Sequence, residues 1–156
     1  MKKSSIELTG RVKLVCKDKN GKVKWNTGWL YNTIAYTGLA ACSGLLGDVD
    51  SQNPFTYLAV GTDSTAESGA HTALQSEITD SGLARASATV TRETTTRTND
   101  TLQLAKTWTA TATKAVEEIG IFNAASAGVM LGRKLTGTKT VNNTDQLIAT
   151  YQVVIS

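Results

Sequence analysis

The feature of this sequence that most restricts its fold is the alternation of apolar and polar residues. From Leu147 to Ile155 every second residue is apolar, and the same two-residue period runs from Ile6 to Cys16. Successive side chains of a β-strand point to opposite faces, so this period gives each segment one dry and one wet face. The 25 threonines, 11 valines and 7 isoleucines also favour strands, because branching at Cβ suits a pleated surface. We therefore expect a mainly β protein.

Two β-hairpins are predicted from turn signals between alternating segments. The first joins Ile6–Cys16 to the segment 23–29 through Asn20-Gly21, a pair of residues typical of tight turns. The second spans residues 84–113 around Asn99-Asp100, and threonine recurs along one of its faces. That threonine-rich face is expected to meet either solvent or a neighbouring subunit.

Further strands are predicted at residues 55–60, 118–123, 129–135 and 147–155. The last strand is expected to be central, since Ile148 and Val154 make its second face apolar as well. About eight strands with turns every 8 to 12 residues are typical of a β-sandwich or jelly roll. The length of 156 residues fits one domain, so we expect a single sandwich over 1–156, with residues 1–5 able to form an N-terminal arm.

One main helix and one short helical turn are expected beside the strands. The spacing of apolar residues in the segment 32–47 predicts the helix, with Asn32 or Thr33 as its N-cap and Gly47 at its end. It should lie over an open end or edge of the sandwich. In the polar loop that follows Gly61, the spacing of Thr72 and Gln75 resembles a capping box and predicts one or two helical turns that bury Leu74 and Ile78.

The net charge of +3 conceals a strongly basic N-terminal region. Residues 1–24 hold eight Lys or Arg against two acidic residues, a balance of +6, so the remainder carries −3. The candidate docking residues are Lys2, Lys3, Lys17, Lys19, Lys22, Lys24, Trp25 and Trp29. The alternatives are that the lysines are solvated charges on an edge strand and that the tryptophans pack in the core.

The residues needed for catalysis are scarce, so we do not expect an enzyme, a metal site or a cofactor. His71 is the only histidine, and Glu117 and Glu118 are strand neighbours that point to opposite faces. No segment is apolar enough to span a bilayer or to act as a signal peptide, so we expect no membrane contact and synthesis in a cytoplasm. Cys16 and Cys42 are then expected to be unpaired and buried, although an oxidising compartment would let them pair.

Several motifs together resemble a family of small structural proteins of tailed bacteriophages. They are "TYLAVGTDSTA", "TALQSEI", a strand bearing Arg85, "EEIGIFNAASAGVMLGRKL" and the final alternating strand, over roughly residues 55–156. Within that family the chain is most similar to capsid decoration (cement) proteins. The resemblance implies a non-enzymatic homotrimer or homodimer on the exterior of the virion capsid, made in the host cytoplasm, which binds the major capsid protein and bridges capsomers.

Two other functions remain open from the sequence. A tail, baseplate or fibre-associated module would bind host surface glycan through the threonine-rich faces and an exposed tryptophan. A small single-strand nucleic-acid-binding protein would use the basic residues together with Trp25 and Trp29. Nucleic acid is the partner that the sequence favours least, because both tryptophans fall on apolar positions of their segment.

Overall fold

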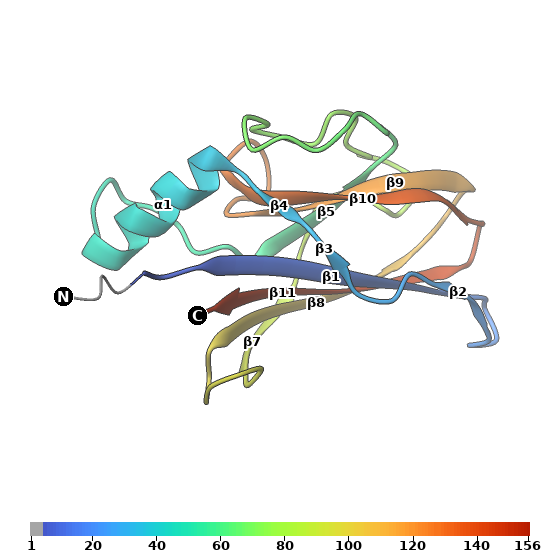
Figure 1. Ribbon diagram of the computed structural model, residues 1–156. Coiled ribbons are helices and arrows are strands. Elements are labelled where there is room, and N and C mark those ends of the chain that lie inside the picture. Colours follow the sequence, from blue (N-terminus) through green and yellow to red (C-terminus); the bar gives the residue numbers. More distant parts are fainter. Residues whose placement is uncertain (1–4) are drawn as a thin grey trace.

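Two antiparallel β-sheets stacked face to face form the computed structural model, which describes residues 5–156 (Figure 1). Sheet A has the strand order β2 (Val23–Asn26), β1 (Leu8–Lys17), β11 (Gln146–Ile155), β8 (Thr101–Thr109) and β7 (Thr89–Glu93), and β3 (Leu30–Tyr31) also pairs with β1. Sheet B has the order β4 (Thr33–Ile34), β10 (Met130–Val141), β9 (Lys114–Phe122), β5 (Tyr57–Gly61) and β6 (Ala86–Ser87). The expected mainly β, sandwich-like fold is confirmed.

The central position predicted for the last strand is also confirmed. β11 lies between β1 and β8, and its pairing with β1 runs without a break from Leu8 opposite Ile155 to Lys17 opposite Gln146. This register places Leu14 opposite Ala149, both on the inner face of sheet A. The alternation read from the sequence therefore decides which side chains enter the core.

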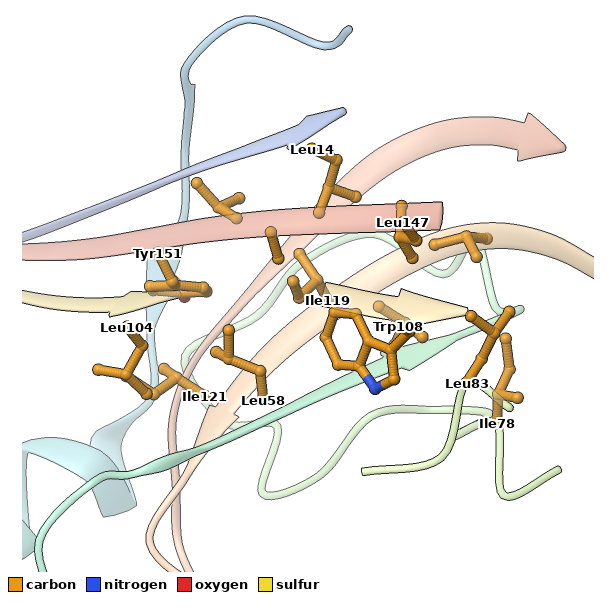
Figure 2. Close-up of a cluster of buried hydrophobic side chains, with 14 of the residues drawn as sticks. Leu14, Leu58, Ile78, Leu83, Leu104, Trp108, Ile119, Ile121, Leu147 and Tyr151 are labelled. Carbon is orange, nitrogen blue, oxygen red and sulfur yellow. The ribbon is translucent and has the colours of Figure 1, made fainter. Parts of the chain in front are cut away.

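The core fills the space between the two sheets with aliphatic and aromatic side chains (Figure 2). Sheet A contributes among others Leu14, Leu104, Trp108, Leu147 and Tyr151, and sheet B contributes Leu58, Ile119 and Ile121. Ile78 and Leu83 come from the segment between β5 and β6, and they cover the end of the core that contains Trp108. Burial of this apolar surface is the main stabilising contribution to the fold.

Eight of the strands have four or more residues, as the sequence predicts, and β3, β4 and β6 are additional two-residue strands. Both predicted hairpins are confirmed. β1 and β2 pair around the turn that contains Gly21, whose φ of 82° is easily reached only without a Cβ. β7 and β8 pair around the turn 94–100, in which Asn99 has a φ of 60°.

The helix α1 (Tyr36–Gly47) is shorter than predicted, and its predicted N-cap is wrong. Thr33 forms part of β4 and pairs with Arg133 of β10, so the chain is still extended at this point. Ala35 is the N-cap residue and makes no side-chain capping bond, whereas the predicted end at Gly47 is confirmed. No helix among residues 5–156 combines the length and the apolar composition that crossing a bilayer requires.

The helical turn predicted around Thr72 and Gln75 is wrong, because the segment 62–76 contains a turn at residues 69 and 70 and several bends but no helical residue. This segment, the covering loop, crosses the outer face of sheet B. Leu74 packs there against Phe122 and Met130. The predicted burial of Leu74 and Ile78 is confirmed. The loop is fixed by polar contacts with sheet B, however, and not by helical hydrogen bonds.

Candidate functional site

The turn between β1 and β2 carries the exposed part of the predicted basic cluster. Lys19 and Lys22 are exposed and Lys17 is half-buried, and we call these three residues the basic tip. The Asp18 carboxylate accepts hydrogen bonds from the backbone N–H groups of Asn20 and Lys22, at 2.8 and 3.0 Å. These bonds fix the turn, so the lysines project from a defined loop at the end of the sandwich opposite α1 (Figure 1).

Lys24 and Trp25 lie close to the basic tip, but both make internal contacts. Lys24 forms an ion pair with the nearly buried Asp145, and the Trp25 indole N–H donates to the Thr140 carbonyl at 2.9 Å. The hydrogen bond to Asp145 raises the pKa of Lys24. Burial disfavours the Asp145 carboxylate, yet hydrogen bonds from Lys24 and from the Asn142 N–H lower its pKa. Both predicted docking residues therefore also tie β2 to β10 and to the turn that precedes β11.

Cys16 lies beneath this ion pair and donates its thiol hydrogen to Asp145, with 3.6 Å between Sγ and the carboxylate. Desolvation, followed by the nearby Asp145 charge, raises the pKa of Cys16 to about 11. Cys16 and Cys42 are both free, Cys16 buried and Cys42 half-buried. Lys2, Lys3 and the predicted N-terminal arm lie outside the described residues, apart from Ser5, which is exposed.

Trp29 lies beside the outer face of sheet A and is 37% exposed. The Arg11 guanidinium and the Lys13 ammonium lie 4.6 and 5.0 Å from its ring centre. Arg11 begins a polar row across the sheet, because its Nε donates to Gln152, and Gln152 in turn donates to Gln103. This open face therefore carries hydrogen-bonded polar side chains, with the Trp29 ring beside them.

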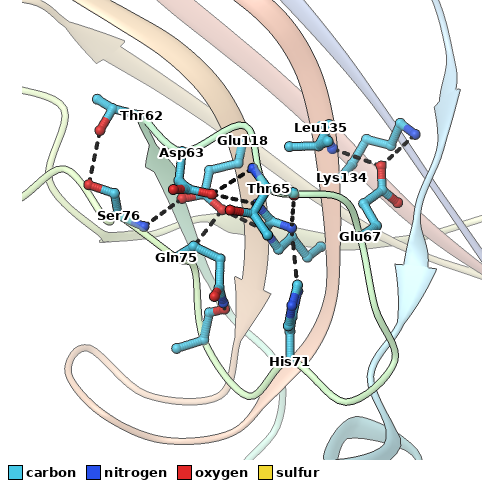
Figure 3. Close-up of polar contacts among 12 residues, drawn as sticks. Thr62, Asp63, Thr65, Glu67, His71, Gln75, Ser76, Glu118, Lys134 and Leu135 are labelled. Carbon is cyan, nitrogen blue, oxygen red and sulfur yellow. Dashed lines mark hydrogen bonds and ion pairs between the residues drawn. The ribbon is translucent and has the colours of Figure 1, made fainter.

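A buried ion pair holds the covering loop on sheet B (Figure 3). Glu118 of β9 is 0% exposed and Arg133 of β10 is 1% exposed, and Arg133 Nε donates to the Glu118 carboxylate at 2.5 Å. The same carboxylate accepts the backbone N–H groups of Gln75 and Ser76 at 3.2 and 2.9 Å. Arg133 Nη1 donates to the Thr65 carbonyl at 2.8 Å. Both ends of the loop are therefore fixed to one pair of charges.

Two further groups surround this ion pair. His71 Nδ1 lies 3.4 Å from Arg133 Nη1, and the half-buried Asp63 carboxylate lies 3.7 Å from Arg133 Nη2. Hydrogen bonds from Thr65 are the main reason that the pKa of Asp63 is lowered. Among residues 5–156 no three His, Cys, Asp or Glu side chains gather closely enough to hold a metal ion.

A second anchor fixes the middle of the covering loop. Burial disfavours the Glu67 carboxylate, but hydrogen bonds from Lys134, from the Leu135 N–H and from Thr33 lower its pKa. These contacts join the loop to β10 and β4, as Figure 3 shows for Lys134 and Leu135. The sequence indicated only that Glu118 points to the opposite face from Glu117, and it predicted neither the pairing of Glu118 with Arg133 nor the anchor at Glu67. The signal of the Glu118–Arg133 pair is a charged residue beside the apolar runs 119–122 and 130–131, whereas Glu67 lies in a polar loop and carries no such signal.

Exposed apolar side chains gather at the opposite end of the molecule from the basic tip. One groove is lined by residues of α1 together with Ile6, Leu8 and Ile155, and a second groove, lined by β7 and β8 residues, shares Ile155 with it. We call the exposed members of both grooves the apolar surface: Ile6, Leu39, Leu45, Leu46, Val90 and Ile155. Leu46 is 85% exposed and Ile6 is 74% exposed, which is unusual for residues of their type.

Comparison of the chain with protein-family models, with curated proteins and with solved structures finds no match. The surfaces described above therefore carry the functional argument.

Proposed function

We propose that this protein is a non-enzymatic structural component of a tailed-phage virion, which decorates the exterior of the capsid and bridges neighbouring capsomers. The basic tip carries this proposal. It gathers two exposed lysines on a fixed turn, with Lys17 at the adjoining end of β1, a shape suited to docking on an acidic protein surface. The motifs of residues 55–156 that resemble phage virion proteins support the same assignment.

The partner in this proposal is the major capsid protein. A shell under internal pressure is strengthened by contacts that span subunit boundaries, and many weak contacts add through multivalency. The covering loop suits this role, because its anchors on Glu118 and Glu67 hold it firmly on the outer face of sheet B. The work of the protein would then be binding alone.

The test removes two charges from the basic tip. The double variant Lys19→Gln/Lys22→Gln should bind shells that lack the protein about 5- to 30-fold more weakly, since exposed ion pairs contribute roughly 0.5–1 kcal/mol each. Its binding should also depend less on salt concentration than that of the wild type. Occupancy is measured by co-sedimentation with purified shells over a range of salt concentrations.

The matched control, Thr89→Glu/Thr107→Glu, changes the net charge by the same amount at exposed positions of sheet A. It should bind like the wild type. Equal occupancy of the tip variant and the wild type would contradict docking through the basic tip. Absence of wild-type protein from capsids, or its concentration at the tail tip, would contradict the proposed function.

The open face of sheet A favours a second candidate, the binding of host surface glycan. Sugars stack on aromatic rings and exchange hydrogen bonds with planar polar groups, and Trp29 lies beside the row formed by Arg11, Gln152 and Gln103. A glycan array with the purified protein tests this candidate. Specific binding that is lost in Trp29→Ala would favour it over capsid decoration.

A further inference from the structure

We propose that the apolar surface binds a second copy of this chain, so that the protein self-associates through the end opposite the basic tip. The inference concerns a surface separate from the basic tip and does not depend on the proposed function. Its members come from three parts of the fold, namely α1, the two terminal strands and the β7–β8 hairpin. Figure 1 shows α1 on one side of the ends of β1 and β11 and the β7–β8 hairpin on the other.

The size of the surface is the first argument. Its six members expose between 37 and 85% of their surface, which adds to about three fully exposed aliphatic residues. An apolar patch of a few hundred Å² is about the largest that a monomer carries, and such patches are often functional. A standard protein–protein interface buries roughly 800 Å² per partner and is about 60% apolar, so burial of this patch would supply a large part of its apolar area.

The charges at the rim are the second argument, and they select a second copy as the occupant. On the α1 side the rim is acidic, because Asp48 and Asp50 follow the helix and both are exposed. The carboxyl end of a helix also carries partial negative charge, and the last turn of α1 holds no basic residue. On the hairpin side the exposed charges are basic, namely Arg92 and Arg97. Glu93 and Asp100 of the same hairpin are half-buried, and their carboxylates accept hydrogen bonds within the hairpin.

A surface with an acidic rim on one side and a basic rim on the other is complementary to itself. Pairing two copies about a twofold axis places the acidic rim of each copy against the basic rim of the other. The apolar residues are then buried between the two copies. The two basic tips then lie at opposite ends of the pair and remain exposed. Such an assembly has the two separated docking points that a bridging protein needs.

The experiment measures the mass of the full chain by light scattering after size-exclusion chromatography, from about 1 to 100 µM. The wild type should reach at least twice the 16.5 kDa of one chain. Leu46→Glu should weaken self-association at least about 30-fold, the effect of a hot-spot residue, because it would bury a charge in the interface. Since Leu46 is 85% exposed, its replacement removes no core contact, and circular dichroism should be unchanged.

The matched control is Tyr31→Glu, an equally drastic change at a residue that is 64% exposed on β3, outside the apolar surface. It should associate like the wild type. A second variant, Arg92→Glu/Arg97→Glu, should also weaken association, since it places like charges at the two facing rims.

A wild type that stays monomeric at 100 µM would overturn the inference and would indicate that a different protein binds the apolar surface. Association that persists in folded Leu46→Glu would overturn it as well. Lys19→Gln/Lys22→Gln should keep the mass of the wild type, so failure of docking at the basic tip and failure of self-association are separate results.

Discussion

Glu118 places a charged side chain in the interior of the protein. Its carboxylate is fully buried, yet one arginine and two backbone N–H groups satisfy it. Removing one partner of a buried ion pair costs far more than the pair contributes, because the remaining charge stays desolvated. Gly61 allows this arrangement, since a Cβ at that position would lie 2.6 Å from the Ser76 carbonyl oxygen.

We predict that Glu118→Leu destabilises the protein by about 3–5 kcal/mol, because Arg133 is left buried without its carboxylate. The covering loop should also lose protection, since the N–H groups of Gln75 and Ser76 lose their acceptor. Chemical denaturation measures the first effect and hydrogen exchange over residues 62–76 the second.

The control for this prediction is Glu117→Leu, at the neighbouring half-buried position of β9. It should change stability by no more than about 0.5 kcal/mol. Unchanged loop protection in Glu118→Leu would show that Leu74 and the Glu67 anchor hold the loop without the buried pair.

At the scale of elements, one glycine determines how α1 lies on the sandwich. A Cβ added at Gly38 would lie 2.6 Å from Leu131 Cα and 2.9 Å from the Met130 carbonyl oxygen. Both are backbone atoms of β10, which cannot move aside as a side chain can. The helix therefore approaches the strand closely only because position 38 lacks a side chain.

We predict that Gly38→Ala destabilises the protein by about 1–3 kcal/mol, because the added methyl group pushes α1 away from β10. Gly47→Ala in the same helix is the control, since its Cβ would meet only Val49 side-chain atoms at 3.8 Å. Alanine there should be neutral or stabilising by up to about 1 kcal/mol. Thermal denaturation compares the two variants, and equal melting temperatures would contradict the close approach.

At the scale of the whole molecule, carboxylates accept hydrogen bonds that either join distant segments or fix a turn. Asp145 is paired with β2, Glu67 joins the covering loop to β10, and Asp100 accepts three backbone N–H groups within the β7–β8 turn. Hydrogen bonds lower the pKa of each group, and for Asp100 those from the Arg97 and Thr95 N–H groups are the largest cause.

We predict that stability is constant near neutral pH and falls as the pH drops below about 4. A carboxyl group whose pKa is lowered in the folded state stabilises the fold when the pH is above the pKa of that group in the unfolded chain, which is about 4. This stabilisation is lost as the pH falls through the pKa of the folded state and the carboxylate is protonated. Melting temperatures between pH 7 and pH 2.5 measure the effect. Asp100→Asn should lower stability at pH 7 and flatten the acid slope, and a slope equal to that of the wild type would contradict this assignment.

The sequence by itself determined the strands, the two hairpins and the inward-facing residues, because side-chain alternation and turn residues act over a few positions. Only the tertiary structure decided where α1 begins, since Thr33 pairs with Arg133 of a strand a hundred residues away. It also decided that a buried carboxylate, rather than a helical turn, orders the covering loop. Lastly, it brought Ile6, Leu46 and Val90 to one end of the sandwich and the lysines to the other. Contacts between distant segments produce no periodic pattern in the sequence, so only the folded structure with its stacked sheets shows them.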